Sequence, residues 1–293
     1  MSISIIIPTL NAEKELPELF TALAKQRLSP DELIVADSES SDRTATIARE
    51  AGAKVLPVLR KDFDHGGTRD FALRASIGDT VVFLTQDAVP ADEFFLEHLI
   101  RPLRGDRVAV VTGRQLPKAD ATPMERLIRE FNYPAESHIR GEEDVARMGI
   151  KAFFCSDVCA AYNREIYLAL GGFDHPLKTN EDMFFAAKAI RGGYRVGYCA
   201  EARVYHSHNF TLREQYARNR IQGYEIERHR DILGDVSKES EGMKLVKAVS
   251  GDLLRQGRIF SFAHFGLDCC ARFLGSRAGK KEYEKELTED RHE

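Results

Sequence analysis

Five short apolar runs, separated by segments of helical periodicity, dominate the sequence up to Thr112. Continuous apolar runs of this length are typical of strands that are buried on both faces of a parallel sheet. The strand-helix alternation predicts an α/β fold, in which a Rossmann-like, mostly parallel sheet carries helices on both faces. The expected strands span residues 3–7, 33–36, 55–59, 80–85 and 108–112.

Polar residues stand at the points where these strands end. The first strand ends in Pro8-Thr9-Leu10-Asn11, a turn that lacks the GxGxxG pattern of a dinucleotide fold. Asp37 follows the second strand, and Gln86-Asp87 follows the fourth. Because the ends of parallel strands are neighbours in space, these residues are expected to meet in one crevice. Taken alone, an Asp at this position more often caps the next helix or closes a turn than binds a ligand.

Further candidates follow in the middle of the chain. Gly66-Gly67 precedes Arg69 at an expected helix start, which is a suitable place for an anion. Asn180 is expected to cap a helix whose first turn holds Glu181 and Asp182. Two short strands, 196–199 and 204–205, lead to His206 and His208. Since side chains alternate along a strand, only one of these histidines is expected to face the crevice, and we favour His206.

Composition excludes several classes of protein. The chain has 293 residues and a formal net charge of −4, which gives no general basic field for binding nucleic acid. Its five cysteines are odd in number and lack CxxC spacing, which favours reduced thiols in a cytoplasmic protein. MSISIIIPTLN is interpreted as a strand and not as a signal peptide, and no run reaches the length of a membrane span.

The C-terminal part of the chain differs in character. We expect a catalytic domain over 1–210, with a mobile loop at 136–147, and a helical region over 211–293 whose tail is disordered after about residue 280. Between Lys244 and Lys281 there are eight basic and two acidic residues, interleaved with large apolar ones. This pattern is typical of a helix on anionic lipid, but also of a helical cap or a dimer face.

The ordered set of motifs is more specific than any one of them. It comprises IIIPTLN, VADSESSDRT, GGTRD, FLTQDAVP, GGFD with NEDMFFA, and VYH. Over Ile3 to His208 this set resembles an inverting family-2 glycosyltransferase of the GT-A fold. The form FLTQDA is similar to that of rhamnosyltransferases of surface-polysaccharide assembly, which implies dTDP-L-rhamnose as the donor.

The resemblance implies a role for each matching residue. Asp182 would be the general base, and Asp87 would bind a divalent cation, Mg²⁺ or Mn²⁺, that bridges the donor diphosphate. His206 would help to hold that metal or the diphosphate. The remaining donor-binding residues would be Pro8, Thr9, Asn11, Asp37 on the pyrimidine, Arg69 near the base or diphosphate, and Gln86.

One departure from the family pattern concerns the metal. Gln86 replaces the first acid of the usual motif, and an amide adds no charge to a cation site. A metal-independent variant therefore stays open. Three further residues have both a functional and a structural interpretation. His65 could contact the donor or be a solvated loop residue, and Glu181 could be catalytic or only complement the helix dipole. Arg218 could bind the diphosphate or the acceptor, or it could belong to a charged helix face.

The predicted reaction is transfer of a sugar from a nucleotide diphosphate to a hydroxyl of a glycan or lipid-linked acceptor. The expected setting is the cytoplasm, with peripheral contact at the inner face of the plasma membrane and a homodimer as further expectations. One alternative is a sugar nucleotidyltransferase, which would carry a Gly-rich basic loop in place of PTLN. Another is a catalytically silent carbohydrate-binding or scaffold protein, which would not need Asp37, Asp87 and Asp182 together.

Overall fold

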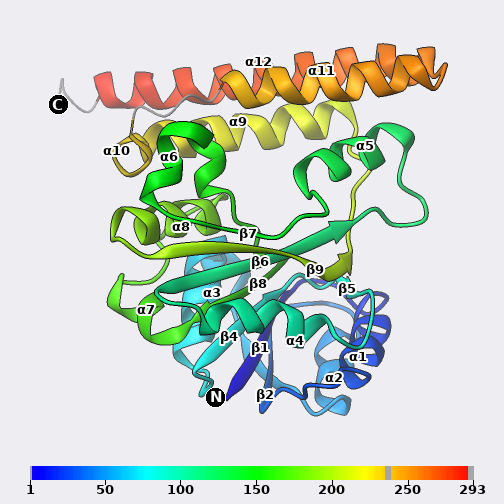
Figure 1. Cartoon of the computed structure of the whole chain (residues 1–293). Coiled ribbons are helices and arrows are strands. Elements are labelled where there is room, and N and C mark those ends of the chain that lie inside the picture. The colour runs from blue at the N-terminus through cyan, green and yellow to red at the C-terminus, as the bar shows by residue number, and fades with distance from the viewer. Residues whose placement is uncertain (1, 235–238, 290–293) are drawn as a thin grey trace.

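A mixed β-sheet forms the centre of the protein, seen here in a computed structural model that describes residues 2–234 and 239–289 (Figure 1). Within these ranges nine strands lie in the order β3-β2-β1-β4-β8-β6-β9-β5, and β7 pairs with β9. The strands are β1 (Ile3–Thr9), β2 (Glu32–Asp37), β3 (Lys54–Pro57), β4 (Thr80–Leu84), β5 (Val89–Pro90), β6 (Val108–Leu116), β7 (His138–Arg140), β8 (Cys159–Asn163) and β9 (Arg195–Tyr205).

The direction of the strands decides which residues meet at one edge. β3, β2, β1 and β4 are mutually parallel, and β6 is parallel to β9. β8 lies between β4 and β6 and is antiparallel to both, so β6 and β9 run in the same direction as β1 to β4. The mostly parallel sheet is therefore confirmed. At its carboxyl edge, β1, β2, β4 and β9 end and β8 begins.

Helices cover both faces of the sheet, as predicted. One apolar cluster includes residues of α3, α7 and α8, and a second, on the other face, includes residues of α1, α2 and α4. The helices are α1 (Leu16–Ala24), α2 (Thr44–Glu50), α3 (His65–Arg74), α4 (Phe95–Ile100), α5 (Pro123–Asn132), α6 (Glu142–Met148), α7 (Arg164–Ala169), α8 (Glu181–Arg191), α9 (Leu212–Arg228), α10 (Arg230–Leu233), α11 (Glu239–Arg255) and α12 (Ile259–Glu289), with 3-10 turns at Arg60–Asp62, Arg101–Arg104 and Gly149–Phe153.

Two predictions about the middle of the chain are wrong. Residues 136–147 are not a mobile loop, because they contain β7 and most of α6. The two strands expected at 196–199 and 204–205 are one strand, β9, which bulges where it pairs with β6. There Gly113 pairs with Cys199 and the next residue, Arg114, pairs with Arg203, so the apparent gap is extra chain accommodated in the bulge.

The C-terminal region is helical in its described part, as predicted, and forms a layer on the side of α9 away from the sheet (Figure 1). Disorder after about residue 280 was a wrong expectation, since α12 continues to Glu289. Arg220 donates to Glu282 at 2.8 Å and Tyr224 to Glu286 at 2.6 Å, which holds this end of α12 on α9. Residues 290–293 lie outside the described ranges. No helix within those ranges combines the length and the apolar character that crossing a membrane requires.

Glycines allow α9 and α12 to pack with their backbones in contact. A Cβ atom at Gly279 would overlap the carbonyl oxygen of Arg220, and one at Gly275 would overlap that of Tyr216. Gly223 of α9 faces Ser276 in the same way. Small residues at such spacing let two helices approach more closely than ordinary side chains permit, so these positions fix where α9 lies.

Gly279→Ala is therefore expected to destabilise the protein by about 1–3 kcal/mol, because overpacked backbone contacts force a shift. The matched control is Gly266→Ala on the same helix, where an added Cβ meets nothing within 4 Å. That change is expected to be neutral or slightly stabilising, since alanine favours the helix. Thermal unfolding of the two variants measures the difference, and an equal effect at both positions would contradict close packing of α9 on α12.

Candidate active site

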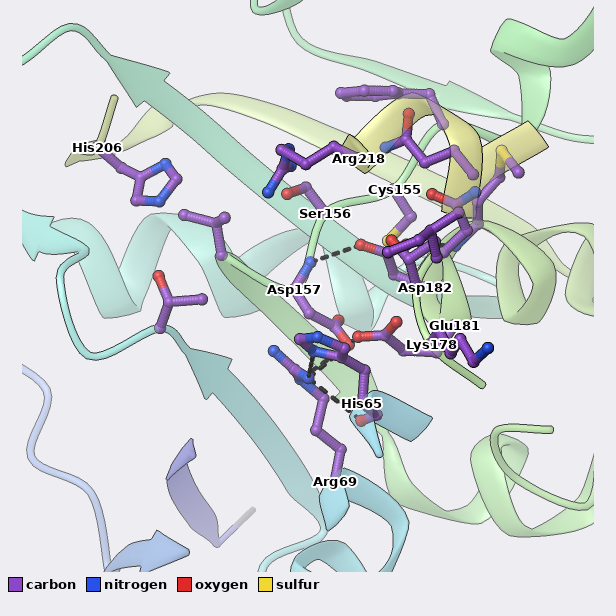
Figure 2. Close-up of a pocket in the computed structure, with 18 of the residues that line it drawn as sticks. His65, Arg69, Cys155, Ser156, Asp157, Lys178, Glu181, Asp182, His206 and Arg218 are labelled. Atoms are coloured by element: carbon purple, nitrogen blue, oxygen red, sulfur yellow. Dashed lines mark hydrogen bonds and ion pairs between the residues drawn. The ribbon is translucent and has the colours of Figure 1, made fainter. Parts of the chain in front are cut away.

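Two adjoining cavities open at the carboxyl edge of the sheet. The larger has a volume of about 550 Å³ and lies between this edge, the start of α8 and the helix α9 (Figure 2). The smaller, of about 440 Å³, lies over the ends of β1, β2 and β4. His65, Arg69 and Thr85 line both cavities, so a single extended ligand can occupy the two together.

The smaller cavity contains part of the predicted donor-binding set. Pro8, Thr9, Arg69 and Gln86 line it, whereas Asp37 and Asn11 do not. Asp37 is buried behind the lining, where its carboxylate accepts from the hydroxyls of Thr9 at 3.2 Å and of Ser40 at 2.5 Å. In the structure, Asp37 therefore supports the wall of the cavity.

Asn11 and Gln86 connect loops to one another. The side-chain oxygen of Asn11 accepts from the backbone N–H of Ser41 at 2.9 Å, which joins the β1–α1 and β2–α2 loops. The side-chain oxygen of Gln86 accepts from the N–H of Leu10 at 2.9 Å. The amide of Gln86 thus holds the segment after β4 to the loop after β1.

A group of metal-ligating side chains lies in the larger cavity. Asp87, His206 and His208 each offer one ligand atom, and these atoms lie within 4.8 Å of one another. The Nε2 atoms of His206 and His208 are 3.5 and 3.4 Å from the carboxylate of Asp87. Beside them, Lys118 donates to Asp87 at 3.2 Å.

The protonation of this group suits a cation. Burial lowers the pKa of His206 to about 3 and also lowers that of His208, so both imidazoles are neutral near pH 7. Burial alone would raise the pKa of Asp87, but the facing histidines and Lys118 outweigh it and hold the pKa below its ordinary value. Nδ1 of His206 is 3.0 Å from the side-chain oxygen of Gln115, which orients the ring with Nε2 toward Asp87.

The expectation that only one of the two histidines faces the crevice is wrong, because both His206 and His208 line the larger cavity. The alternation rule holds only within a strand, and β9 ends at Tyr205. Beyond that residue the chain turns, so His206 and His208 point to the same place, with ring centroids 4.7 Å apart. A sequence signal was present in the spacing HSH directly after a strand, which brings two imidazoles to one strand end.

An acidic cluster forms the floor of the larger cavity (Figure 2). Asp182, in the first turn of α8, lines the cavity and accepts from the backbone N–H of Asp157 at 3.0 Å and from that of Met183 at 2.7 Å. The buried guanidinium of Arg69 pairs with Glu181 at 3.0 Å and approaches Asp157 to 3.4 Å. One cation thus faces three carboxylates.

The charge imbalance controls the protonation of the cluster. Burial, together with the negative charges of Glu181 and Asp157, raises the pKa of Asp182 well above its ordinary value. Burial also raises the pKa of Asp157 to about 7, although Arg69 and the hydroxyl of Tyr162, which donates at 2.6 Å, oppose the rise. The dipole of α8 favours the ionised form of Asp182, but burial near like charges prevails. A carboxylate with a raised pKa is a stronger base.

The remaining candidates frame the same cavity. His65 lies between the two cavities, with Nδ1 3.4 Å from Arg69, and burial lowers its pKa. Arg218 of α9 reaches the cavity from the opposite side and stacks over the ring of Phe210 at 4.4 Å.

Asn180 occupies the N-cap position of α8 with φ 65°, but its side chain makes no capping hydrogen bond, contrary to expectation. Sequence reasoning missed Asp157, Lys118 and Gln115.

The architecture defines a class of protein, the glycosyltransferases of the GT-A fold. The fold is similar to that of a mannosyltransferase from Pyrobaculum calidifontis in complex with GDP-Man and Mn²⁺, with a TM-score of 0.67 and 16% identity over 94% of this chain and 86% of the other. It is also similar to glucosyl-3-phosphoglycerate synthase from Mycobacterium tuberculosis in complex with Mn²⁺, UDP and phosphoglyceric acid, with a TM-score of 0.56 and 20% identity over 81% and 80%.

Sequence comparison gives the family. Residues 4–171 match the description Glycosyl transferase family 2, and the chain belongs to this family. It is 39% identical over 283 residues to the O-antigen chain rhamnosyltransferase RfbN of Salmonella typhimurium, covering 96% of this chain and 90% of the relative. It is 40% identical over 282 residues to the O-antigen chain rhamnosyltransferase WbaN of Salmonella anatum, covering 95% and 89%. The predicted family and enzyme class are confirmed.

Proposed function

We propose that the protein transfers L-rhamnose, with inversion, from dTDP-L-rhamnose to a hydroxyl of a glycan or lipid-linked acceptor. The observation that carries this proposal is the larger cavity, which Asp182 and the group Asp87, His206 and His208 line together. The names of the two Salmonella relatives support rhamnose as the sugar and an O-antigen chain as the type of acceptor. The smaller cavity, between Pro8 and Phe63, is assigned to the nucleoside.

The metal-ligating group fits a divalent cation. One ionised carboxylate and two neutral imidazoles offer it oxygen and nitrogen ligands, and Gln115 orients one of the rings. Imidazole ligands favour Mn²⁺ over Mg²⁺ at such a site. When bound, the metal would neutralise the charge that develops on the leaving diphosphate. Lys118 and Arg218 add fixed positive charge around the same cavity.

Asp182 is assigned to the acceptor side of the reaction. Its carboxylate is held by two backbone N–H groups, which fixes its position without consuming a side-chain partner. The acceptor hydroxyl would donate its proton to this carboxylate as its oxygen attacks the anomeric carbon of the donor. Burial, together with the charges of Glu181 and Asp157, holds the pKa of Asp182 high. Arg69 offsets part of the negative charge of the cluster.

Two other functions are disfavoured by specific features. A nucleotidyltransferase would need a Gly-rich, basic loop at the end of β1, but here β1 ends in Pro8-Thr9 and continues into Leu10-Asn11. A silent carbohydrate-binding protein would have no use for a buried acid cluster next to a metal-type site. The free state of all five cysteines supports a reducing compartment, which is the basis for assigning the reaction to the cytoplasm.

A thermal-shift panel with Mn²⁺ tests the donor. Near saturation, dTDP-L-rhamnose is expected to raise the unfolding temperature by roughly 5 °C, since a ligand at 100 times its Kd adds about 2.7 kcal/mol. UDP-glucose and GDP-mannose are the controls and are expected to shift it less. A larger shift with either control, followed by release of its nucleotide when acceptor is added, would contradict rhamnose as the donor sugar. Release of pyrophosphate from dTTP and a sugar 1-phosphate would favour a nucleotidyltransferase.

A further inference from the structure

The helices α11 and α12 form a hairpin whose outer surface is unusually apolar. Phe260 is 93% exposed and Ile259 is 67% exposed at the start of α12, directly after the turn between the two helices. Leu254, at the end of α11, is 52% exposed beside them. We call residues 254–260 the hairpin tip. Further large apolar side chains on the hairpin that are more than half exposed are Met243, Leu267, Phe273 and Leu274.

The exposed residues are not left over from an incompletely packed helix. The inward side of α12 is already occupied, with Phe265, Asp268, Gly275 and Gly279 buried. Val249 and Leu253 of α11 pack with α5 in a separate apolar cluster. At 100° per residue, Leu267, Leu274 and Lys281 follow one line along α12, on the side opposite these buried positions. The inner apolar side of the hairpin is therefore buried against the rest of the protein, and its outer apolar side is exposed.

Positive charge surrounds the outer side. The two acidic residues between Lys244 and Lys281 are neutralised locally, because Asp252 pairs with Arg255 and Asp268 with Arg272. In the described ranges no carboxylate lies within ion-pair distance of the side chains of four basic residues of this segment, namely Lys247, Arg258, Arg277 and Lys281. The exposed surface between Lys244 and Lys281 is thus apolar and cationic together, whereas α12 beyond Lys281 carries glutamates. The counterpart of this segment has to be apolar and anionic.

We propose that the outer side of the α11–α12 hairpin docks on the surface of an anionic lipid bilayer. The tip inserts Ile259 and Phe260 into the boundary between headgroups and acyl chains, and the four basic side chains contact the headgroup phosphates. Figure 1 shows the hairpin as the outermost layer, on the side of α9 away from the sheet, so a flat surface reaches it without touching the sheet.

A second copy of the chain fits this surface less well. A two-fold dimer brings the same patch of each protomer together, so the basic residues of both copies would face one another across the interface. Like charges at an interface oppose association, whereas phosphatidylglycerol headgroups neutralise the same residues. The charge pattern therefore selects lipid.

Vesicle flotation tests the proposal with the full chain. The protein is expected to float with vesicles of phosphatidylcholine and phosphatidylglycerol, to remain at the bottom with phosphatidylcholine alone, and to lose binding as salt is raised. The double variant Ile259→Ser and Phe260→Ser, and separately Arg258→Glu with Lys281→Glu, are each expected to bind the anionic vesicles about tenfold more weakly.

The matched control is Ile77→Ser, because Ile77 is 70% exposed but lies between α3 and β4, outside the hairpin. This variant is expected to float like the wild type. All variants should retain the wild-type unfolding temperature and the donor-induced thermal shift, so that a failure of docking is separate from a failure of the proposed function. Two results would overturn the proposal. The first is wild-type protein that stays at the bottom with anionic vesicles. The second is a wild-type dimer, seen by light scattering, that the double variant dissociates while its flotation is unchanged.

Discussion

Asp182→Asn is expected to lower the rate of sugar transfer by about 10²–10⁴-fold while leaving donor affinity almost unchanged. Asparagine keeps the shape of the side chain but cannot accept the proton of the acceptor hydroxyl. Pro8 and Thr9, which are proposed to bind the donor, lie in the smaller cavity, which Asp182 does not line. The measurements are kcat with acceptor present and the Kd of the donor from a titration. A variant that turns over at nearly the wild-type rate would exclude Asp182 as the base.

The pH profile gives this prediction a signature of its own. Burial and the charges of Glu181 and Asp157 raise the pKa of Asp182, so the ionised base is lost as the pH falls through that raised value. The wild-type kcat/KM should therefore rise with pH through this region, and the residual rate of Asp182→Asn should lack the same limb. Glu165→Gln is the matched control, because Glu165 also occupies the first turn of a helix, α7, but lines neither cavity.

The parts of the site that depend on a single strand could be predicted from sequence. Pro8 and Thr9 are the last residues of β1, and Asp87 follows β4. A continuous apolar run that stops at a polar residue marks a strand end without knowledge of the partner strand. Once the sheet is taken as parallel, the ends of such strands must meet at one edge. This reasoning needs only local pattern and a general rule of sheet topology.

Asp157 could not be found in this way because it precedes a strand. β8 is antiparallel to β4 and β6, so its beginning, and not its end, lies at the carboxyl edge of the sheet. No local feature of the sequence indicates the direction of a strand within a mixed sheet. The same limit applies to Lys118 and Gln115, whose positions depend on how β6 continues past the bulge of β9 to pair with the end of that strand.

The protonation of Asp182 illustrates a second limit. From the sequence, the only known field was that of its own helix, which favours the ionised form. The structure adds burial and two further carboxylates from Glu181 and Asp157, and these effects are larger. Residues that lie far apart along the chain, such as Arg69 and Asp157, set this balance. A sequence pattern can therefore locate a catalytic carboxylate but cannot give its pKa.

Asp87→Asn is expected to remove most of the divalent-metal affinity and to reduce transfer by at least about 100-fold. Asp87 is the only carboxylate in the group with His206 and His208, so its replacement leaves two neutral imidazoles and no ligand charge. The shape is preserved, so lost charge and not lost packing should account for the effect. Binding of Mn²⁺ in the presence of dTDP, followed by electron paramagnetic resonance, measures the affinity directly.

The control for this prediction is His98→Ala, a histidine of α4 that lies outside both cavities. Its ring lies 3.2 Å from the backbone carbonyl oxygen of Glu201 and stacks on Phe94. It should bind Mn²⁺ like the wild type, while His208→Ala should fall between the control and Asp87→Asn because one imidazole and the carboxylate remain. Addition of a chelator separates the two interpretations of Gln86. If the enzyme depends on a metal, the chelator abolishes sugar transfer by the wild type. If Asp87→Asn and the chelated wild type both retain full activity, the enzyme is metal-independent, and Lys118 and Arg218 neutralise the diphosphate.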